Sequence, residues 1–479
     1  MPGFMRCGLK LLVGFAGWMS SVLFGFSPAF GQSNAEVAAV LQRVLVADSS
    51  QAELRPVRRF YAALNFAPAW TSPAGWLPLS ADALRLLTRA PEFGLLPAEY
   101  ELPALLHLTD SLQCPGASAA TRLVQRVRCE LLFTKALLNL GQHLQKGRLA
   151  EQPFTTGTTV PPDPDAANML LRARRSGSVA ASLLALQPTG RSYVRLLWAW
   201  QHLLRTDTAA ARRLRPTVAI NLERLRWEPA ADSLYVVVNI PSYTLQVVRG
   251  PQVVRSFRVI VGETPTPTPE LYSHIRFFET SPEWRVPHSI AVGEMLPRLR
   301  RNPGYLGANN FLLYDRQGKV VNPRSIKWQT VTPETFVYSI RQIACCDNAL
   351  GNVVFRFPNP HDIFVHDTPT RELFNKRSRA LSHGCIRLEK PLQLASFLLR
   401  RDYGSKAQSR IDLMWDSVYS GYGKFFPLRN PVPIVVRYVT CEADGPQLRL
   451  LPDVYGRDEA LQKRFFDVPT ASPLVSVGN

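Results

Sequence analysis

The chain has 479 residues, of which 46% are hydrophobic and 19% are charged. This length predicts two or more packed units, and this composition excludes a chain that is disordered throughout. The formal net charge of +19 would attract any polyanion. Because the sequence has no recognisable nucleic-acid-binding module, we expect no nucleic-acid partner.

Residues 1–31 have the layout of a secretory signal peptide. Arg6 and Lys10 precede an uncharged, mostly apolar run over 11–26, and the small residues Ala29 and Gly31 suit cleavage after Gly31. The alternative is an uncleaved membrane anchor, although this run is shorter than a typical span of about 20 residues. Either reading places the bulk of the chain outside the cytoplasm, and we expect no stable membrane span after cleavage.

Residues 34–215 are predicted to be mainly helical. Between Cys129 and Gly147, apolar residues recur at helical spacing, and similar runs occur at 81–90 and 192–205. The Thr-, Pro- and Asp-rich segment 151–168 is typical of a connecting loop. No catalytic side chains are concentrated in this half of the sequence.

A β-rich region begins near Leu234. Short runs of β-branched and aromatic residues at 234–240, 243–248 and 256–261 are separated by turn residues, which predicts an antiparallel β unit. Residues 288–349 differ from the β-rich regions on either side, and we expect helices at 294–301 and 331–343 there. An insertion of this length is often a lid or a binding element.

The most informative motif is Ser382-His383-Gly384-Cys385-Ile386-Arg387. A cysteine nucleophile needs a nearby base or positive charge, an exposed turn, and backbone donors for the oxyanion that develops on the substrate. Gly384 leaves room at the turn, Arg387 would share a strand face with Cys385, and His366 is close enough in sequence to reach the thiol. We therefore expect a cysteine-dependent enzyme.

Two other interpretations of Cys385 remain open. It could be a structural thiol or a disulfide partner, because six cysteines follow the signal segment: Cys114, Cys129, Cys345, Cys346, Cys385 and Cys441. It could also bind zinc together with His361, His366 and His383. These residues lack the short paired spacings of structural zinc sites, and Arg387 would place a positive charge beside the metal.

The same motif resembles the signature of the YkuD-type L,D-transpeptidases, which carry a partner histidine on a preceding strand, here His366. Similarity to the long periplasmic members (YcbB-like) extends over 350–369 and other segments: 60–70, 94–100, 221–227, 284–287 and 303–306. Long members usually carry a small helical peptidoglycan-binding domain ahead of the position of Asn221. Only residues 206–214 separate the last scaffold helix from Arg215-Pro216, so we expect that domain to be missing.

The resemblance implies an α+β multidomain fold. A helical scaffold domain is expected over 34–215 and a mainly β catalytic domain over 216–440. The insertion at 288–349 would be a lid, and 441–479 a C-terminal tail.

The resemblance also implies a periplasmic enzyme of cell-wall biogenesis that forms third-to-third cross-links between peptidoglycan stem peptides. Cys385 would be the nucleophile and His366 the base and then the acid, with the backbone carbonyl of Asp367 as the third group. His383, Gly384 and Arg387 would complete the site. The partners would be a donor tetrapeptide and an acceptor amine, with no cofactor or metal. Hydrolysis by an L,D-carboxypeptidase, attachment of an envelope protein, and a non-catalytic wall-binding scaffold are the alternatives.

Overall fold

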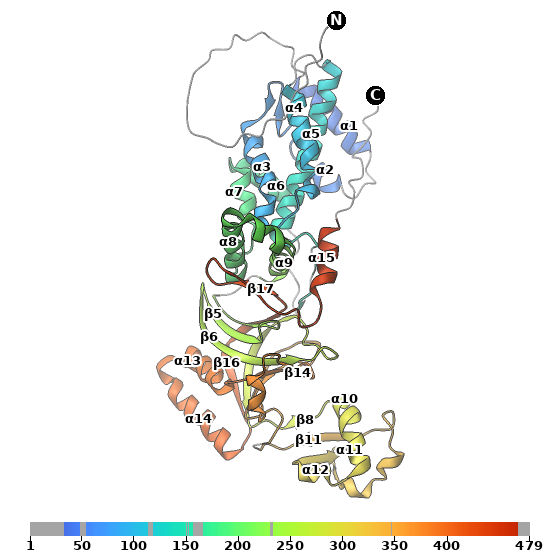
Figure 1. Cartoon of the computed structure of the whole chain (residues 1–479), viewed down its shortest axis with the longest axis vertical. Coiled ribbons are helices and arrows are strands. Elements are labelled where there is room, and N and C mark those ends of the chain that lie inside the picture. The colour runs from blue at the N-terminus through green and yellow to red at the C-terminus, as the bar shows by residue number, and fades with distance from the viewer. Residues whose placement is uncertain are drawn as a thin grey trace.

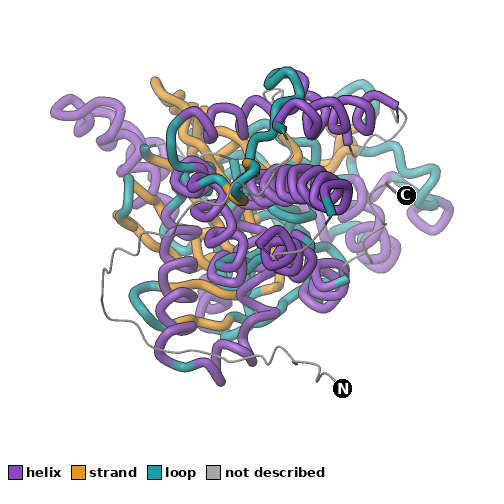
Figure 2. The backbone as a smooth tube through the Cα atoms, turned by 90° about the horizontal axis from the view of Figure 1, so that it is seen from above, coloured by secondary structure: helices purple, strands orange, loops and turns teal. Residues whose placement is uncertain are grey.

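The computed structural model describes residues 33–47, 54–113, 118–149, 151, 153–156, 166–229, 233–345 and 347–467. The predicted signal segment, Cys114 and Cys346 lie outside this set. The molecule is elongated, with a helical unit at one end, a β unit in the middle and an inserted subdomain at the other end (Figure 1). The units are stacked end to end, so that helices overlap strands when the molecule is viewed along its long axis (Figure 2).

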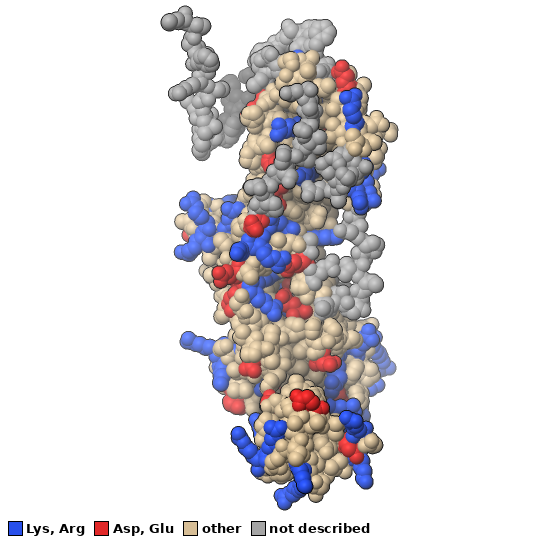
Figure 3. Space-filling view, turned by 90° about the vertical axis from the view of Figure 1, so that its right-hand side faces the viewer, with Lys and Arg blue, Asp and Glu red and all other residues tan. Residues whose placement is uncertain are grey.

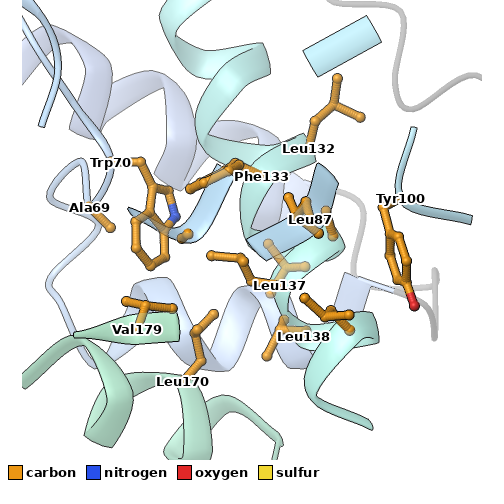
Figure 4. Packing of buried hydrophobic residues seen from close by; sticks show 14 of the residues in the cluster. Ala69, Trp70, Leu87, Tyr100, Leu132, Phe133, Leu137, Leu138, Leu170 and Val179 are labelled. Atoms are coloured by element: carbon orange, nitrogen blue, oxygen red, sulfur yellow. The ribbon is translucent and has the colours of Figure 1, made fainter. Parts of the chain in front are cut away.

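The helical unit packs around one long central helix. That helix, α5 (Ala119–Lys146), begins where Ser118 Oγ accepts the N–H of Thr121. Leu132, Phe133, Leu137 and Leu138 lie on it and point into a core that also includes Trp70 (Figure 4). The other helices of this unit are α1 (Asn34–Ala47), α2 (Arg55–Ala62), α3 (Pro78–Thr88), α4 (Leu102–Gln113), α6 (Ala166–Arg175), α7 (Val179–Leu184) and α8 (Arg191–Thr206). The predicted helices at 81–90, 129–147 and 192–205 are thus confirmed.

A buried carboxylate on α5 organises this core. Glu130 is fully buried, and its oxygens accept the backbone N–H groups of Ala69, Trp70 and Thr71 at 2.7–3.0 Å. The hydroxyl of Tyr61 donates to the same carboxylate at 2.7 Å. A buried charge is tolerated when it is fully hydrogen-bonded, as here. These contacts tie the loop between α2 and α3 to α5.

Helix α9 (Thr208–Trp227) joins the helical unit to the β unit. It follows α8 after Asp207 and runs through the predicted domain boundary at 215–216. Asn221 on α9 exchanges hydrogen bonds with Thr440 (2.7 and 2.9 Å), beyond the last barrel strand. Glu223 accepts the N–H of Leu149 at 2.6 Å. The similarity at 221–227 therefore falls on a buried helix that contacts both units.

The β unit is a sheet that closes on itself. Its strand order is β12-β13-β15-β6-β5-β4-β16-β7, and β12 also pairs with β7, so no edge of this ring is left unpaired. The strands are β4 (Leu234–Asn239), β5 (Thr244–Arg249), β6 (Gln252–Gly262), β7 (Leu271–Thr280), β12 (Val353–Arg356), β13 (Val365–His366), β15 (Ile386–Leu388) and β16 (Lys424–Arg437). Two further strands, β3 (Thr155–Thr156) and β14 (Ala380–Ser382), pair with β7 and β6.

The antiparallel unit predicted over 234–261 is confirmed, because β4 pairs antiparallel with β5 and β5 with β6, but the rest of the ring also contains parallel pairs. β13 pairs in parallel with β15, β16 with β4, and β14 with β6. These pairings join segments that are far apart in the sequence, and the local runs of β-forming residues do not encode them. Helices α13 (Pro391–Tyr403) and α14 (Ala407–Ser420) follow β15, and Leu394, Leu398 and Met414 pack into the barrel core.

The insertion is a folded subdomain with its own small sheet, β10-β9-β11-β8. The strands are β8 (Trp284–Arg285), β9 (Phe311–Tyr314), β10 (Val320–Val321) and β11 (Ser339–Gln342), and the helices are α10 (His288–Ile290), α11 (Leu296–Arg301) and α12 (Tyr305–Ala308). A separate core surrounds the buried Trp328. The helix predicted at 294–301 is confirmed as α11, preceded by a π-helical turn at 291–295. The helix predicted at 331–343 is wrong, because β11 lies there.

The segment expected to be a tail is folded as far as residue 467. A hairpin of β17 (Cys441–Ala443) and β18 (Leu448–Leu450) is followed by α15 (Asp458–Phe466), which contacts α9. None of the helices in the described ranges is long and apolar enough to cross a membrane. Lys and Arg side chains project at many points along the face shown in Figure 3, including the end that carries the insertion.

Candidate active site

Two short parallel strands bring the predicted site residues together. His366 on β13 pairs with Arg387 on β15, and Val365 pairs with Ile386. Val365 and Ile386 lie in the barrel core. Because side chains alternate along a strand, His366 and Arg387 lie on the opposite face, and Cys385 directly precedes β15. That His366 reaches the Cys385 thiol, and that Arg387 shares a face with Cys385, stay predictions.

The turn before β15 is held by side chain-to-backbone hydrogen bonds. Gly384 has a φ of +116°, a conformation that side-chain-bearing residues rarely adopt. Ser382 Oγ donates to the carbonyl of Cys385 at 2.6 Å and accepts the N–H of Gly384 at 3.2 Å. Thr268 Oγ1 donates to the carbonyl of Gly384 at 2.7 Å. These bonds fix the backbone that presents the Cys385 sulfur.

One backbone donor of this turn is available to a ligand. The Gly384 N–H is occupied by Ser382, whereas the Cys385 N–H makes no hydrogen bond to any residue in the described ranges. Of the Gly384 and Cys385 amides, only that of Cys385 is therefore free. A free N–H beside a nucleophile can stabilise negative charge on an attacked carbonyl oxygen.

The Cys385 thiol is held in its protonated form. Burial raises its pKa to about 11, against the opposing effects of the Phe364 backbone N–H and the charge of Arg387. The sulfur lies 3.9 Å from the carbonyl oxygen of Asp362, to which the S–H can donate weakly. Asp362 has a φ of +51°, an uncommon value for a residue with a side chain. Strained backbone of this kind clusters at functional sites.

His366 is neutral in this environment. Burial, together with the smaller effect of the Arg387 charge, lowers its pKa to about 3. The backbone of Asp367 acts in the opposite direction, but His366 Nδ1 makes no hydrogen bond of normal geometry. The role of the Asp367 carbonyl as the third group stays a prediction. A neutral imidazole can accept a proton from a thiol.

The side chain of Asp367 anchors the strand that carries His366. Its buried carboxylate accepts the N–H of Asn352 at 2.9 Å and a guanidinium N–H of Arg371 at 3.0 Å. Gly351, with a φ of +59°, passes so close that an added Cβ would lie 2.5 Å from Asp367. Only glycine fits this approach. Burial raises the pKa of Asp367.

Arg387 and His383 have different surroundings. Arg387 is half-buried beside the thiol and donates to Thr370 Oγ1 at 3.4 Å. His383 is exposed, and its Nε2 lies 2.8 Å from Oε1 of Glu294 in the insertion. β14, which leads into the turn, lies on the side of the barrel that faces α10 (Figure 1). The Glu294 contact links the insertion to the residue two positions before the nucleophile.

Within the described ranges, no group of three or more His, Cys, Asp or Glu residues could hold a metal ion. The four residues considered as zinc ligands thus do not form such a group. Cys129, Cys345, Cys385 and Cys441 are free thiols. Sequence reasoning missed Asp362, Glu294 and Thr268, each of which reaches the site from a separate segment, and no local motif marked them.

Two family descriptions match the chain. Residues 233–419 match the YkuD L,D-transpeptidase catalytic domain, and residues 55–199 match the Scaffold domain. A curated relative from Haemophilus influenzae, named "Putative L,D-transpeptidase", is 37% identical over 244 residues. The alignment covers 51% of this chain and 48% of that relative, so the chain spans about half the length of the curated protein it matches.

Solved structures show a more distant likeness. An L,D-transpeptidase from Mycobacterium smegmatis is 16% identical, with a TM-score of 0.20 over 43% of this chain and 58% of that chain. L,D-transpeptidase 1 of Mycobacterium tuberculosis is 14% identical, with a TM-score of 0.16. The match covers 43% of this chain and 62% of that chain. Scores this low carry no argument about function, and the assignment rests on the matched domains. Residues 233–419 are therefore similar to the YkuD L,D-transpeptidase catalytic domain, and residues 55–199, which precede them, to the Scaffold domain.

Proposed function

We propose that this protein forms third-to-third cross-links between peptidoglycan stem peptides through a thioester on Cys385. The proposal is supported by the pairing of β13 with β15, which has His366 opposite Arg387, and by the free N–H of Cys385 directly before β15. A neutral thiol, a neutral imidazole, a cation and an unoccupied amide are the groups that acyl transfer requires. The catalytic-domain match supports the same reaction class.

In the first half-reaction, the Cys385 sulfur attacks the carbonyl carbon of the diamino acid at the third stem position. His366 takes the S–H proton as the C–S bond forms, and the Cys385 N–H stabilises the oxyanion. Collapse of the tetrahedral intermediate breaks the C–N bond to the terminal D-alanine. His366 returns its proton to the departing amine, which leaves a thioester and a neutral imidazole.

In the second half-reaction, the side-chain amine of a second stem attacks the thioester carbonyl. The new C–N bond forms, the C–S bond breaks, and the amine proton passes through His366 to the sulfur. Thiol and imidazole return to their starting forms, so no cofactor is needed to balance the reaction. Arg387 would attract a stem carboxylate and hold the donor beside the sulfur.

The insertion over 288–349 would act as a lid on the donor side of the site. The Glu294–His383 contact supports this role, because it links the insertion to the catalytic turn. Closing a lid excludes water from a thioester, which favours an amine as the acceptor over hydrolysis. We place the reaction in the periplasm, in keeping with the signal segment predicted over residues 1–31.

The test is mass spectrometry of purified tetrapeptide muropeptides incubated with the mature protein and with a Cys385→Ala control. Cross-linked dimers that carry a third-to-third bond, absent with the control, would support the proposal. Tripeptides alone would indicate an L,D-carboxypeptidase. Stem peptides attached to added envelope protein, without dimers, would indicate protein anchoring. Unchanged muropeptides that nevertheless bind the protein would indicate a non-catalytic wall-binding scaffold.

A further inference from the structure

A cavity of about 540 Å³ opens beside the catalytic turn but does not include it. Its wall contains Glu263 after β6, Arg377 and Ala380 at the start of β14, and Tyr243 before β5. Pro452 and Val454, from the segment after the β17–β18 hairpin, complete an apolar part of the wall. Neither Cys385, His366 and Arg387 nor any residue of the insertion is among the lining residues. The cavity is therefore distinct from the donor side of the site.

Strand pairing brings this cavity next to the turn. β6 runs antiparallel to β15, with Ile260 opposite Arg387, so the end of β6 lies beside the start of β15. The N–H of Glu263 donates to the carbonyl of Ser382 at 2.9 Å. The cavity and the Cys385 turn are thus separated by one hydrogen-bonded backbone segment. A ligand in the cavity would approach the reactive sulfur from the β6 side.

The cavity presents two opposite charges that the protein leaves unused. The carboxylate of Glu263 and the guanidinium of Arg377 are exposed, and neither has an ion-pair or hydrogen-bond partner among the described residues. Their neighbour Arg379 differs, because it donates to the carbonyls of Val259 (3.1 Å) and Tyr243 (3.0 Å). The free pair therefore suits a ligand that carries both an amine and a carboxylate.

Both substrates of the proposed reaction must reach the same carbonyl carbon. The donor acyl group stays on Cys385 while the acceptor enters, so the acceptor needs its own approach to the thioester. We propose that this cavity binds the acceptor stem peptide, with Arg377 holding a stem carboxylate and Glu263 holding the amino end next to the turn. The inference rests on the proposed function and names its second binding site. The bound ammonium releases one proton to solvent, and the neutral amine then attacks the thioester as described above.

The experiment separates the two half-reactions. Acylation of Cys385 is followed by intact-protein mass spectrometry with a tetrapeptide donor. Dimer and hydrolysed tripeptide are then quantified over a range of tripeptide acceptor concentrations. The variants are Glu263→Gln, Arg377→Gln and the double variant. The matched controls are Lys376→Gln and Glu372→Gln, which remove exposed charges that do not line the cavity.

Each cavity variant should raise the acceptor KM about two- to fivefold, as the loss of one exposed ion pair predicts, and the double variant about tenfold. The hydrolysed fraction should rise, while the acylation rate should stay within about twofold of the wild type. An acceptor whose carboxylates are amidated should be insensitive to Arg377→Gln. The control variants should match the wild type.

Three results would overturn the inference. One is an unchanged acceptor KM in the double variant. Another is a parallel loss of acylation, which would assign these residues to the donor or to folding. The third is an equal rise of the acceptor KM in the control variants. Hydrolysis without any dimer in the wild-type protein, or no acylation at all, would be a different result, because it would reject the proposed function itself.

Discussion

At the scale of single residues, the resting site pairs a thiol with a neutral imidazole. Burial raises the pKa of Cys385 to about 11 and lowers that of His366 to about 3, so both groups are uncharged near neutral pH. A preformed thiolate–imidazolium pair would need the opposite order of pKa values. We therefore expect His366 to take the proton during the attack, as a general base.

This order of pKa values predicts how Cys385 reacts with an alkylating reagent. Below its pKa, a thiol loses about tenfold in thiolate for each pH unit. The alkylation rate of the Cys385 peptide, followed by mass spectrometry, should therefore rise steadily from pH 6 to pH 9. A rate that is already constant at pH 6 would show that the thiolate exists in the resting enzyme.

His366 and His383 should differ sharply on substitution. Removing a general base typically lowers the rate about a hundred- to ten-thousand-fold, so His366→Ala should lose acylation by about that factor. His383 is exposed and contacts Glu294, so His383→Ala should lose no more than about tenfold. Single-turnover acylation measures both. If His383→Ala were the more damaging change, the assignment of the base would be wrong.

The residues named from sequence all came from one motif or from its family resemblance. Cys385 lies two residues before Arg387, in the turn that precedes β15, a spacing that a sequence can show. Asp362 and Glu294 could not be found in this way. Asp362 contributes a carbonyl group, which any residue carries, and Glu294 reaches the turn only because the insertion folds back.

At the scale of elements, the insertion is more ordered than an ordinary long loop. The insertion has its own core around Trp328. Where it joins the barrel, the side-chain amide of Asn348 donates to the carbonyls of Pro282 and Ile343. Such a unit should move as a body about this junction while its interior stays protected from hydrogen exchange. The Glu294–His383 pair is the contact that would hold it against the turn.

Glu294→Gln tests that contact. An exposed polar contact stabilises by no more than about 1 kcal/mol, so its loss should speed alkylation of Cys385 by no more than about fivefold at fixed pH. Glu334→Gln, which alters another exposed carboxylate of the insertion, is the matched control. Equal rates in the two variants would show that the pair does not control access to the thiol.

Secondary structure in the insertion was the least predictable part of the fold. Phe336 and Ile340 are both buried, and their spacing of four resembles one face of a helix. Ile340 instead lies on β11, between β9 and β8, and this pairing depends on residues far away in the sequence. The helices of the region that matches the Scaffold domain, by contrast, lie where the helical spacing of apolar residues predicted them.

At the scale of the whole molecule, the scaffold and the barrel are joined through α9 and the C-terminal segment. Arg224 on α9 pairs with Asp458 of α15 at 2.6 Å, and Arg148 of the scaffold pairs with Glu99 and reaches carbonyls of the C-terminal segment. The two-unit organisation could be predicted from the change in residue pattern near Leu234. The role of α9 could not, because a buried linking helix has the same local pattern as a scaffold helix.

The stability of the helical unit should depend on Glu130. In Glu130→Gln, an NH₂ group would replace one oxygen that accepts backbone N–H groups, leaving buried donors unpaired at a cost of about 2–4 kcal/mol. Chemical denaturation of the whole protein should show this loss. Asp110→Asn, at an exposed site on α4, should leave the free energy of unfolding within about 0.5 kcal/mol of the wild type.

The central claim is that the stem peptide becomes covalently attached to Cys385. Intact-protein mass spectrometry after rapid mixing with a tetrapeptide donor and acid quenching tests it most directly. The account predicts a mass gain equal to the donor minus D-alanine, located on the Cys385 peptide and absent in Cys385→Ala and Cys385→Ser. Cross-linked product formed without this adduct, or formed at wild-type rate by Cys385→Ser, would contradict it.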